Sequence, residues 1–185
     1  MAPPIPPDKA PKCALPDQSK WTHKEKVRLA AEAKKVQDRR KPEDYKNYFD
    51  SSVEPLNEMA RTLQLGDVFC LLALSANESG WLNVENAWLN NLFGLTAGGK
   101  DNLGFESLKQ AADYWVCRYG PYVKGVKNRD DFVQGLKNAG YNTANPDYYT
   151  KKKWDDMIIS INTRYSQCGY ERYEEKGIWL LKKKG

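Results

Sequence analysis

The chain has 185 residues, of which 41% are apolar and 12% aromatic, and it carries a formal net charge of +5. This length suits one domain around a single hydrophobic core, and the apolar content excludes an intrinsically disordered protein. Because no apolar run reaches the roughly 18 residues that a membrane-spanning helix needs, we expect no membrane insertion.

The first residues, MAPPIPPDKAP, contain five prolines and lack the apolar core of a secretory signal peptide. We therefore interpret residues 1–20 as a Pro-rich tail and residues 21–185 as a single folded domain. A general-secretion signal is not expected.

A first helix is predicted over residues 22–40, capped by Thr22 with Glu25 three residues later and ending before Pro42. Residues 20–41 hold nine Lys or Arg against three acidic residues. Such a segment could attract nucleic acid or an anionic polymer, but a solvated helix face explains it equally well. Because no nucleic-acid motif accompanies it, we do not expect nucleic-acid binding.

Two further helices are predicted at 54–64 and 67–79, separated by Gly66, with Asp67 as the N-cap of the second. The second helix is apolar nearly all round, which is typical of a buried helix. Its last turn nevertheless contains a carboxyl group, that of Glu78.

The spacing of Leu71, Leu74 and Glu78 places all three on one helical stripe, so the carboxyl group projects from an apolar surface. Burial and the negative end of the helix dipole both disfavour its ionisation. Both effects should raise the pKa of Glu78 toward the range in which a carboxyl group donates a proton near neutrality. A solvent-exposed Glu before an ordinary Gly cap is the alternative interpretation of this residue taken alone.

More helices are predicted at 106–118, 129–138 and 147–165. No run alternates convincingly between apolar and polar residues, so at most a short hairpin is expected, around TAGGKDNLG at 96–104. The fold class that these elements indicate is mainly α.

The four cysteines and the single histidine lack metal-ligand spacing, so neither a metal site nor a cofactor is expected. Cys70 and Cys117 lie in apolar helical sequence, which is typical of buried thiols. Cys13 and Cys168 flank the folded part, and we predict a disulfide between them in an oxidising compartment.

Four sequence blocks occur in a fixed order: ANESGW at 76–81, NNLFGL at 90–95, FESLKQAADYW at 105–115 and AGYNTANPDYYTKK at 139–152. Together they resemble the glucosaminidase family of peptidoglycan hydrolases (glycoside hydrolase family 73), relatives of lysozyme. The resemblance extends over residues 67–163. It implies a lysozyme-like helical lobe with a much reduced β-hairpin lobe, in one catalytic domain.

The resemblance also implies an enzyme that cleaves the β-1,4 glycan backbone of peptidoglycan, as an N-acetylglucosaminidase. It implies that Glu78 is the general acid. The substrate-binding residues expected on the same ground are Trp81, Asn90, Asn91, Phe93, Tyr114, Tyr141 and Tyr148.

The loop between Gly94 and Phe105 departs from the family, which usually inserts a longer β-hairpin lobe with a second acid there. Asp101 is the only acidic residue of the shortened loop and is the candidate second catalytic carboxylate. A turn-forming role beside two glycines explains Asp101 equally well. If Asp101 is not catalytic, the 2-acetamido group of the substrate could act in its place, oriented by Tyr141 or an Asn.

We expect an antibacterial toxin of the type VI secretion effector kind, delivered without a general-secretion signal and acting in the periplasm or cell wall of a target bacterium. Its expected partners are peptidoglycan glycan strands and an immunity protein that occludes the cleft. The alternatives are a phage endolysin and a non-catalytic peptidoglycan-binding module.

Overall fold

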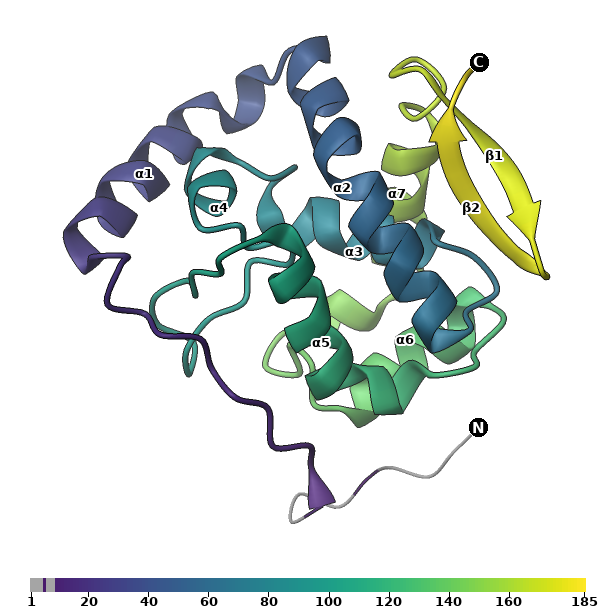
Figure 1. Ribbon diagram of the computed structural model, residues 1–185, viewed down its shortest axis with the longest axis horizontal. Coiled ribbons are helices and arrows are strands. Elements are labelled where there is room, and N and C mark those ends of the chain that lie inside the picture. Colours follow the sequence, from purple (N-terminus) through teal and green to yellow (C-terminus); the bar gives the residue numbers. More distant parts are fainter. Residues whose placement is uncertain (1–4, 6–8) are drawn as a thin grey trace.

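The computed structural model describes residue 5 and residues 9–185, and this part of the chain is mainly helical (Figure 1). Residues 1–4 and 6–8 of the predicted tail lie outside the described residues. The helices are α1 (His23–Val36), α2 (Pro42–Leu63), α3 (Phe69–Ser79), α4 (Val84–Trp88), α5 (Leu108–Val123), α6 (Arg129–Asn138) and α7 (Lys151–Asn162). Two 3-10 turns, η2 (Gln37–Arg39) and η3 (Pro146–Tyr149), and two strands, β1 (Tyr170–Glu175) and β2 (Ile178–Lys183), complete the described secondary structure.

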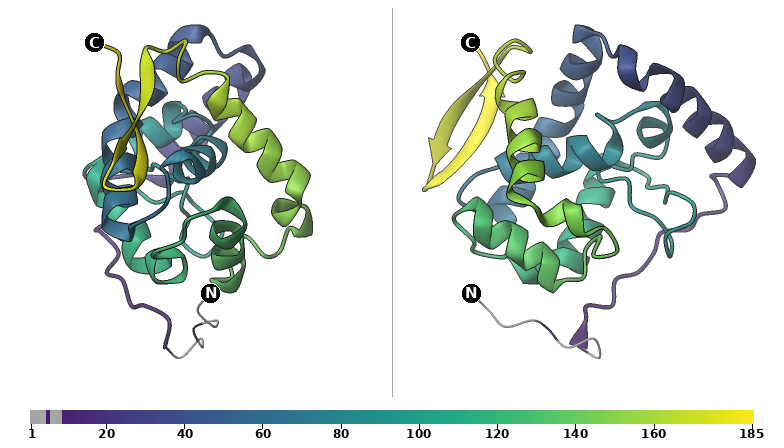
Figure 2. Two further views of the ribbon diagram at one scale, coloured as in Figure 1. Left: turned by 90° about the vertical axis from the view of Figure 1, so that its right-hand side faces the viewer. Right: turned by 180° about the vertical axis from the view of Figure 1, so that it is seen from behind.

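The fold is lysozyme-like, as predicted, and the part of the chain that the structure describes contains one short antiparallel hairpin. Figures 1 and 2 show α1 and the hairpin at opposite ends of the molecule, with α3 between them. Seen from behind, α7 packs across α3 (Figure 2). No helix within the described residues is both long and apolar enough to cross a membrane.

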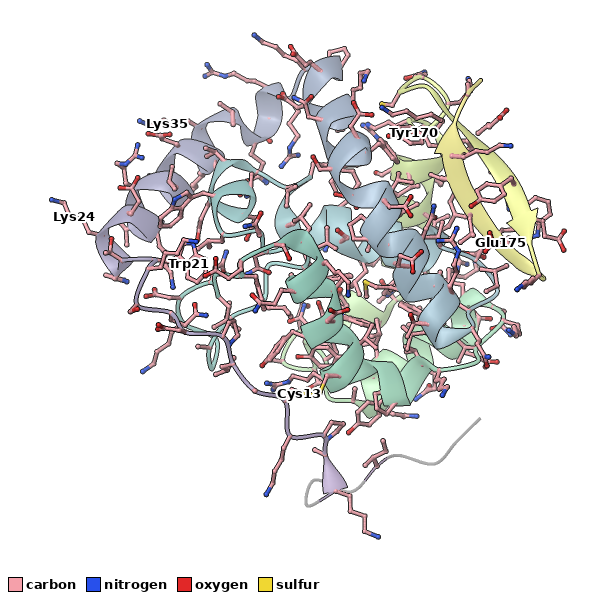
Figure 3. All side chains as sticks on the ribbon, viewed as in Figure 1. Cys13, Trp21, Lys24, Lys35, Tyr170 and Glu175 are labelled. Carbon is pink, nitrogen blue, oxygen red and sulfur yellow. A yellow bond between two sulfur atoms is a disulfide. The ribbon has the colours of Figure 1, made fainter. Side chains whose placement is uncertain are left out.

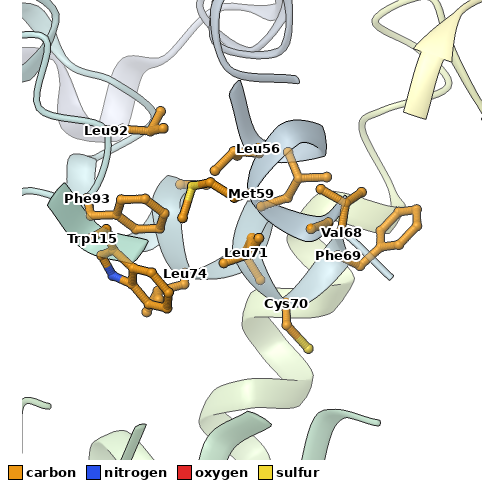
Figure 4. Close-up of a cluster of buried hydrophobic side chains, with 14 of the residues drawn as sticks. Leu56, Met59, Val68, Phe69, Cys70, Leu71, Leu74, Leu92, Phe93 and Trp115 are labelled. Atoms are coloured by element: carbon orange, nitrogen blue, oxygen red, sulfur yellow. The ribbon is translucent and has the colours of Figure 1, made fainter. Parts of the chain in front are cut away.

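Helix α3 forms the centre of the hydrophobic core (Figure 4). Leu71, Leu72 and Leu74 have no exposed surface, and they pack among side chains of α2, α5 and the loop before α5. Because apolar residues surround this helix on every side, its burial is what the sequence pattern predicts. The core therefore holds rigidly the helix that ends at the predicted catalytic acid.

Several helix boundaries agree with the sequence. The Thr22 hydroxyl accepts a hydrogen bond from the Glu25 amide at 3.3 Å and caps α1, and α6 has its predicted bounds. Helix α2 begins at Pro42 rather than at residue 54, because proline suits the first turn of a helix, and Pro55 lies inside it. Helix α4 was not predicted.

The hairpin of β1 and β2 was not predicted, and a single antiparallel bridge forms where at most a short hairpin was expected. Residues 96–104 contain one isolated bridge, between Thr96 and Asn102, whereas β1 and β2 lie at the C-terminus. Lys176 and Gly177 form their turn with φ of 50° and 81°, a left-handed pair typical of tight hairpins. The register then places Tyr173 opposite Leu180.

The predicted disulfide is also wrong, since Cys13 is bonded to Cys117 and not to Cys168. Cys117 is exposed on α5. Figure 3 shows Cys13, in the N-terminal segment, beside that helix. Cys168 and Cys70 are free and buried. The prediction failed because the order of cysteines along the chain does not show which helix the N-terminal segment packs against.

Candidate active site

Glu78 occupies the last turn of α3, as predicted, and the chain then turns back sharply. Gly80 ends the helix with φ of 60°, and Trp81 follows with φ of 59°. The NNLFG segment packs against this turn, because a Cβ on Gly94 would lie 2.2 Å from the Glu78 carbonyl oxygen. Only glycine permits this approach, which explains physically why the ANESGW and NNLFGL blocks occur together.

The environment of the Glu78 carboxyl favours its protonated form. Burial raises the pKa of Glu78 above its usual value, in agreement with the sequence argument. The Asn77 amide, which donates to Glu78 Oε1 at 3.2 Å, and the Lys153 ammonium each offset part of the rise in pKa. Lys153 is held there by a 3.1 Å hydrogen bond from its Nζ to Asn77 Oδ1.

Three tyrosines surround this carboxyl group: Tyr141, just after α6, and Tyr148 and Tyr149 of η3. Burial raises the pKa of each phenol, and the neighbouring Glu78 charge raises it further. The three hydroxyls therefore stay protonated and are available as donors. Tyr141 and Tyr148 were predicted site residues, whereas Tyr149 was not.

Two of these hydroxyls lack a protein partner. The hydroxyl oxygens of Tyr148 and Tyr149 are buried and form no hydrogen bond within the described residues. Tyr148 lies close enough to lower the pKa of Glu78 somewhat, but without hydrogen-bond geometry. Buried polar groups are normally satisfied, so unpartnered donors beside a carboxyl group indicate a place where a ligand or water supplies the missing partner.

Three predicted substrate-binding residues instead build the loop that follows α4. Asn91 is fully buried, and its Nδ2 donates to the carbonyls of Leu95 at 2.8 Å and Leu103 at 2.9 Å. Phe93 is 1% exposed and stacks on Trp115 at 5.1 Å. Burial therefore corrects the prediction of direct substrate contact for these two.

Asn90 has φ of 50° and donates from Nδ2 to the Phe105 carbonyl at 3.0 Å, which joins the loop to the start of the α5 region. Tyr114 packs against Phe105 at 5.7 Å, and its hydroxyl accepts a hydrogen bond from Arg118 at 3.3 Å. A cavity of about 470 Å³ opens beside Glu78, and Tyr114 does not line it.

Trp81 is half-buried beside the end of α3. Its ring meets Tyr45 edge-on at 4.8 Å and Tyr48 at 5.2 Å, and the Arg164 guanidinium lies 5.3 Å from its centre. These contacts fix the orientation of the indole, which also borders the cavity at Glu78.

The cavity at Glu78 is bounded by the last turn of α3, the start of α4 and one face of α1 with Arg40. Its volume is within the range of small-ligand sites. A more apolar hollow of about 400 Å³ between α2 and α5 contains none of the predicted site residues.

The cavity at Glu78 is also lined by a second acidic residue, Glu85, which the sequence analysis did not identify. Glu85 is 8% exposed, and burial raises its pKa, while Lys26 lowers it and Asp101 raises it. Asn83 caps the short helix by accepting from the Asn86 amide at 3.0 Å. The segment NVENAW, with an Asn cap before an acidic first turn, was the signal that could have identified α4.

Asp101 is not brought into this cavity. Its Oδ2 lies 2.7 Å from His23 Nδ1, at the start of α1, and both side chains are well exposed. The structure thus connects the shortened loop to α1 through Asp101.

No protein-family model matches the chain, and no curated protein matches it in sequence. Its fold is similar to that of a type VI secretion system effector–immunity complex from Pseudomonas protegens, with a TM-score of 0.56 and 25% identity over 66% of this chain and 94% of that one. A mutant peptidoglycan hydrolase from Sphingomonas sp. A1 has a TM-score of 0.54 and 20% identity over 66% of this chain and 99% of that one. These neighbours agree with the resemblance to peptidoglycan hydrolases in the sequence.

Proposed function

We propose that the protein is a peptidoglycan hydrolase that cleaves the β-1,4 glycan backbone, with Glu78 as the general acid. The observation behind this proposal is a carboxyl group of raised pKa at a cavity, next to two buried tyrosine hydroxyls without partners. A protonated Glu78 can donate to the glycosidic oxygen as the bond breaks. The similarity in fold to the peptidoglycan hydrolase from Sphingomonas sp. A1 supports peptidoglycan as the substrate.

The nucleophile is proposed to come from the substrate. As Glu78 protonates the glycosidic oxygen and that bond breaks, the acetamido oxygen of N-acetylglucosamine bonds to the anomeric carbon, which requires one protein acid and a donor that orients the acetamide. Water then attacks the anomeric carbon of this cyclic intermediate and gives a proton to the Glu78 carboxylate, which opens the ring and restores both the acetamide and the acid. Tyr148 and Tyr149 are suitable donors, because their hydroxyls are protonated and unpartnered. In this mechanism the enzyme is an N-acetylglucosaminidase, residues 21–185 form its catalytic domain, and Asp101 acts through the position of α1.

The test is the Glu78→Gln variant on purified peptidoglycan, with chromatography of the released fragments. We expect a loss of about 10²- to 10⁴-fold in rate, because the amide keeps the shape of the side chain but cannot donate the proton. The wild-type rate should fall as pH rises through the raised pKa of Glu78. The Glu78→Gln substitution should change the free energy of unfolding at neutral pH by less than about 1 kcal/mol.

Glu174→Gln serves as the control, since Glu174 is an exposed glutamate on β1, far from the cavity. Its rate should equal that of the wild type. Turnover retained by Glu78→Gln would refute the mechanism.

We propose further that the enzyme is an antibacterial effector with an immunity partner, as the similarity to the Pseudomonas protegens complex suggests. Directing the protein to the periplasm of a bacterial host should cause lysis, whereas cytoplasmic expression should not, because the glycan lies outside the cytoplasm. A Glu78→Gln protein should be harmless in both compartments. Equal toxicity of the wild type in both would indicate a different target.

A further inference from the structure

Helix α1 lies outside residues 67–163, over which the sequence resembles the glucosaminidase family, yet it forms a wall of the cavity at Glu78. The side chains that face the cavity from α1 and the first residue of η2 are Ala30, Ala33, Lys34 and Gln37, which follow one helical stripe. Two small residues in this stripe leave room for a ligand.

Several contacts fix this wall in place. Gln18 exchanges two hydrogen bonds with the backbone of Gly104, at 2.9 Å and 2.8 Å. The Trp21 ring covers Gly104 so closely that a Cβ there would lie 2.1 Å from it. With the His23–Asp101 contact and the disulfide to α5, these bonds attach the N-terminal side of α1 to the body. A wall fixed in this way can position a ligand group.

Arg40 stands where this cavity meets a second hollow of about 340 Å³ that reaches α2. Both hollows are lined by Arg40, Gly80, Trp81 and Asn83, so together they form a continuous trough. The Arg40 Nη2 atom lies 3.5 Å from the position a Cβ would take on Gly80, two residues after Glu78. A ligand that runs from Glu78 toward α2 must pass this guanidinium.

The cations along the trough have no protein partner. Arg28, elsewhere on α1, is paired with Glu25 and Glu32, and Arg61 and Arg129 are paired as well. The side chains of Lys34 and Arg40 form neither a hydrogen bond nor an ion pair within the described residues, although both line the cavity. The acids that share these walls are Glu78, Glu85 and, toward α2, Asp44.

We propose that Arg40, assisted by Lys34, forms a carboxylate-binding subsite for the stem peptide that the glycan carries. This inference rests on the proposed function. Peptidoglycan bears short peptides with free carboxylates on alternate sugars, next to the bonds to be cut. A planar guanidinium with no partner pairs with a carboxylate through two parallel hydrogen bonds, and a nearby ammonium adds attraction. Binding of the peptide at Arg40 would place the adjoining glycosidic bond at Glu78.

The first test measures binding in the inactive Glu78→Gln background by calorimetry. The probes are a disaccharide that bears a tetrapeptide and the same disaccharide without the peptide. Arg40→Gln should weaken binding of the peptide-bearing probe about tenfold, as the loss of one charge-assisted contact predicts, and should leave the peptide-free probe unchanged. Arg40→Lys should weaken binding of the peptide-bearing probe less than Arg40→Gln does, because it keeps the charge but loses the paired hydrogen bonds, and thermal unfolding confirms that each variant is folded.

Lys35→Gln is the matched control, because it removes one positive charge five residues before Arg40, outside the trough. Figure 3 shows Lys35 at the outer surface of α1. It should bind both probes as the parent does. Equal weakening of both probes by Arg40→Gln, no weakening of either, or failure of the parent to bind the peptide-bearing probe would overturn the subsite.

The second test compares hydrolysis of intact sacculi with that of glycan strands freed of peptides by an amidase. In the active enzyme, Arg40→Gln should raise KM on sacculi about tenfold and leave KM on stripped strands unchanged. If the wild type hydrolyses neither polymer, the proposed function fails. The subsite is then judged by the binding difference alone, so the two failures are distinguishable.

Discussion

The end of α3 and the start of α4 each place a glutamate in the wall of one cavity, and their surroundings differ. Burial is the largest cause of a raised pKa for both Glu78 and Glu85. Around Glu78 lie three protonated tyrosines, and the buried hydroxyls of Tyr148 and Tyr149 form no hydrogen bond with the described residues. Around Glu85 lie the buried Lys26 of α1 and, through the loop, Asp101.

This difference teaches that a raised pKa reports burial and does not by itself identify a catalytic acid. Structural carboxyl groups under a helix acquire the same shift. The distinguishing feature at Glu78 is the presence of donors that the protein leaves unpartnered, since such groups are costly unless a ligand satisfies them. Glu85 lies beneath α1, where a cation partly compensates its charge.

The largest expected effect is the difference in hydrolysis rate between the Glu78→Gln and Glu85→Gln variants. Glu85→Gln should keep the rate within about tenfold of the wild type, whereas Glu78→Gln loses the contribution of a general acid. Initial rates on one peptidoglycan preparation measure both. A loss for Glu85→Gln as complete as that for Glu78→Gln would break the comparison and make Glu85 the second catalytic carboxyl.

The next prediction concerns the attachment of the α1 side. Replacing Cys13 and Cys117 together with serine should lower the free energy of unfolding by about 2–4 kcal/mol, because the disulfide closes a long loop in the unfolded chain. The two cysteines are 104 residues apart. Denaturant titration measures the change. A reducing agent should lower the free energy of unfolding of the wild type to that of the double variant, and it should not change that of the double variant. If the reducing agent leaves the wild type unchanged, the disulfide is contradicted.

The smallest expected effect is that of Asp101→Asn. Because Asp101 contacts His23 and does not line the cavity, its loss should slow hydrolysis at least an order of magnitude less than Glu78→Gln does. Both variants are to be compared on the same substrate. Equal, near-complete losses would show that Asp101 is a catalytic partner and that the shortened loop closes over the cavity.

Local patterns in the sequence were sufficient for several features. The apolar stripe that ends in Glu78 predicted a buried helix with a raised carboxyl pKa, and the structure has both. Thr22 and the bounds of α6 followed from capping residues and helix periodicity. Tyr141 and Tyr148 were expected from the family resemblance of the block at 139–152 and not from a local pattern, and the fold brings both near Glu78.

Other features depended on contacts between distant segments. The pairing of Cys13 with Cys117, the burial of Asn91 and Phe93, and the position of Glu85 under α1 all required the packed chain.

The sequence by itself determined the helical class, the central helix and the acid at its end, because periodicity and capping act within a few residues. Only the tertiary structure decided which asparagine is a loop support, which cysteines meet and which cations face the cavity at Glu78. The physical reason is that burial, pairing and cavity walls are properties of surfaces brought together. Arg40, for example, faces the cavity because the fold packs it beside Gly80 at the end of α3.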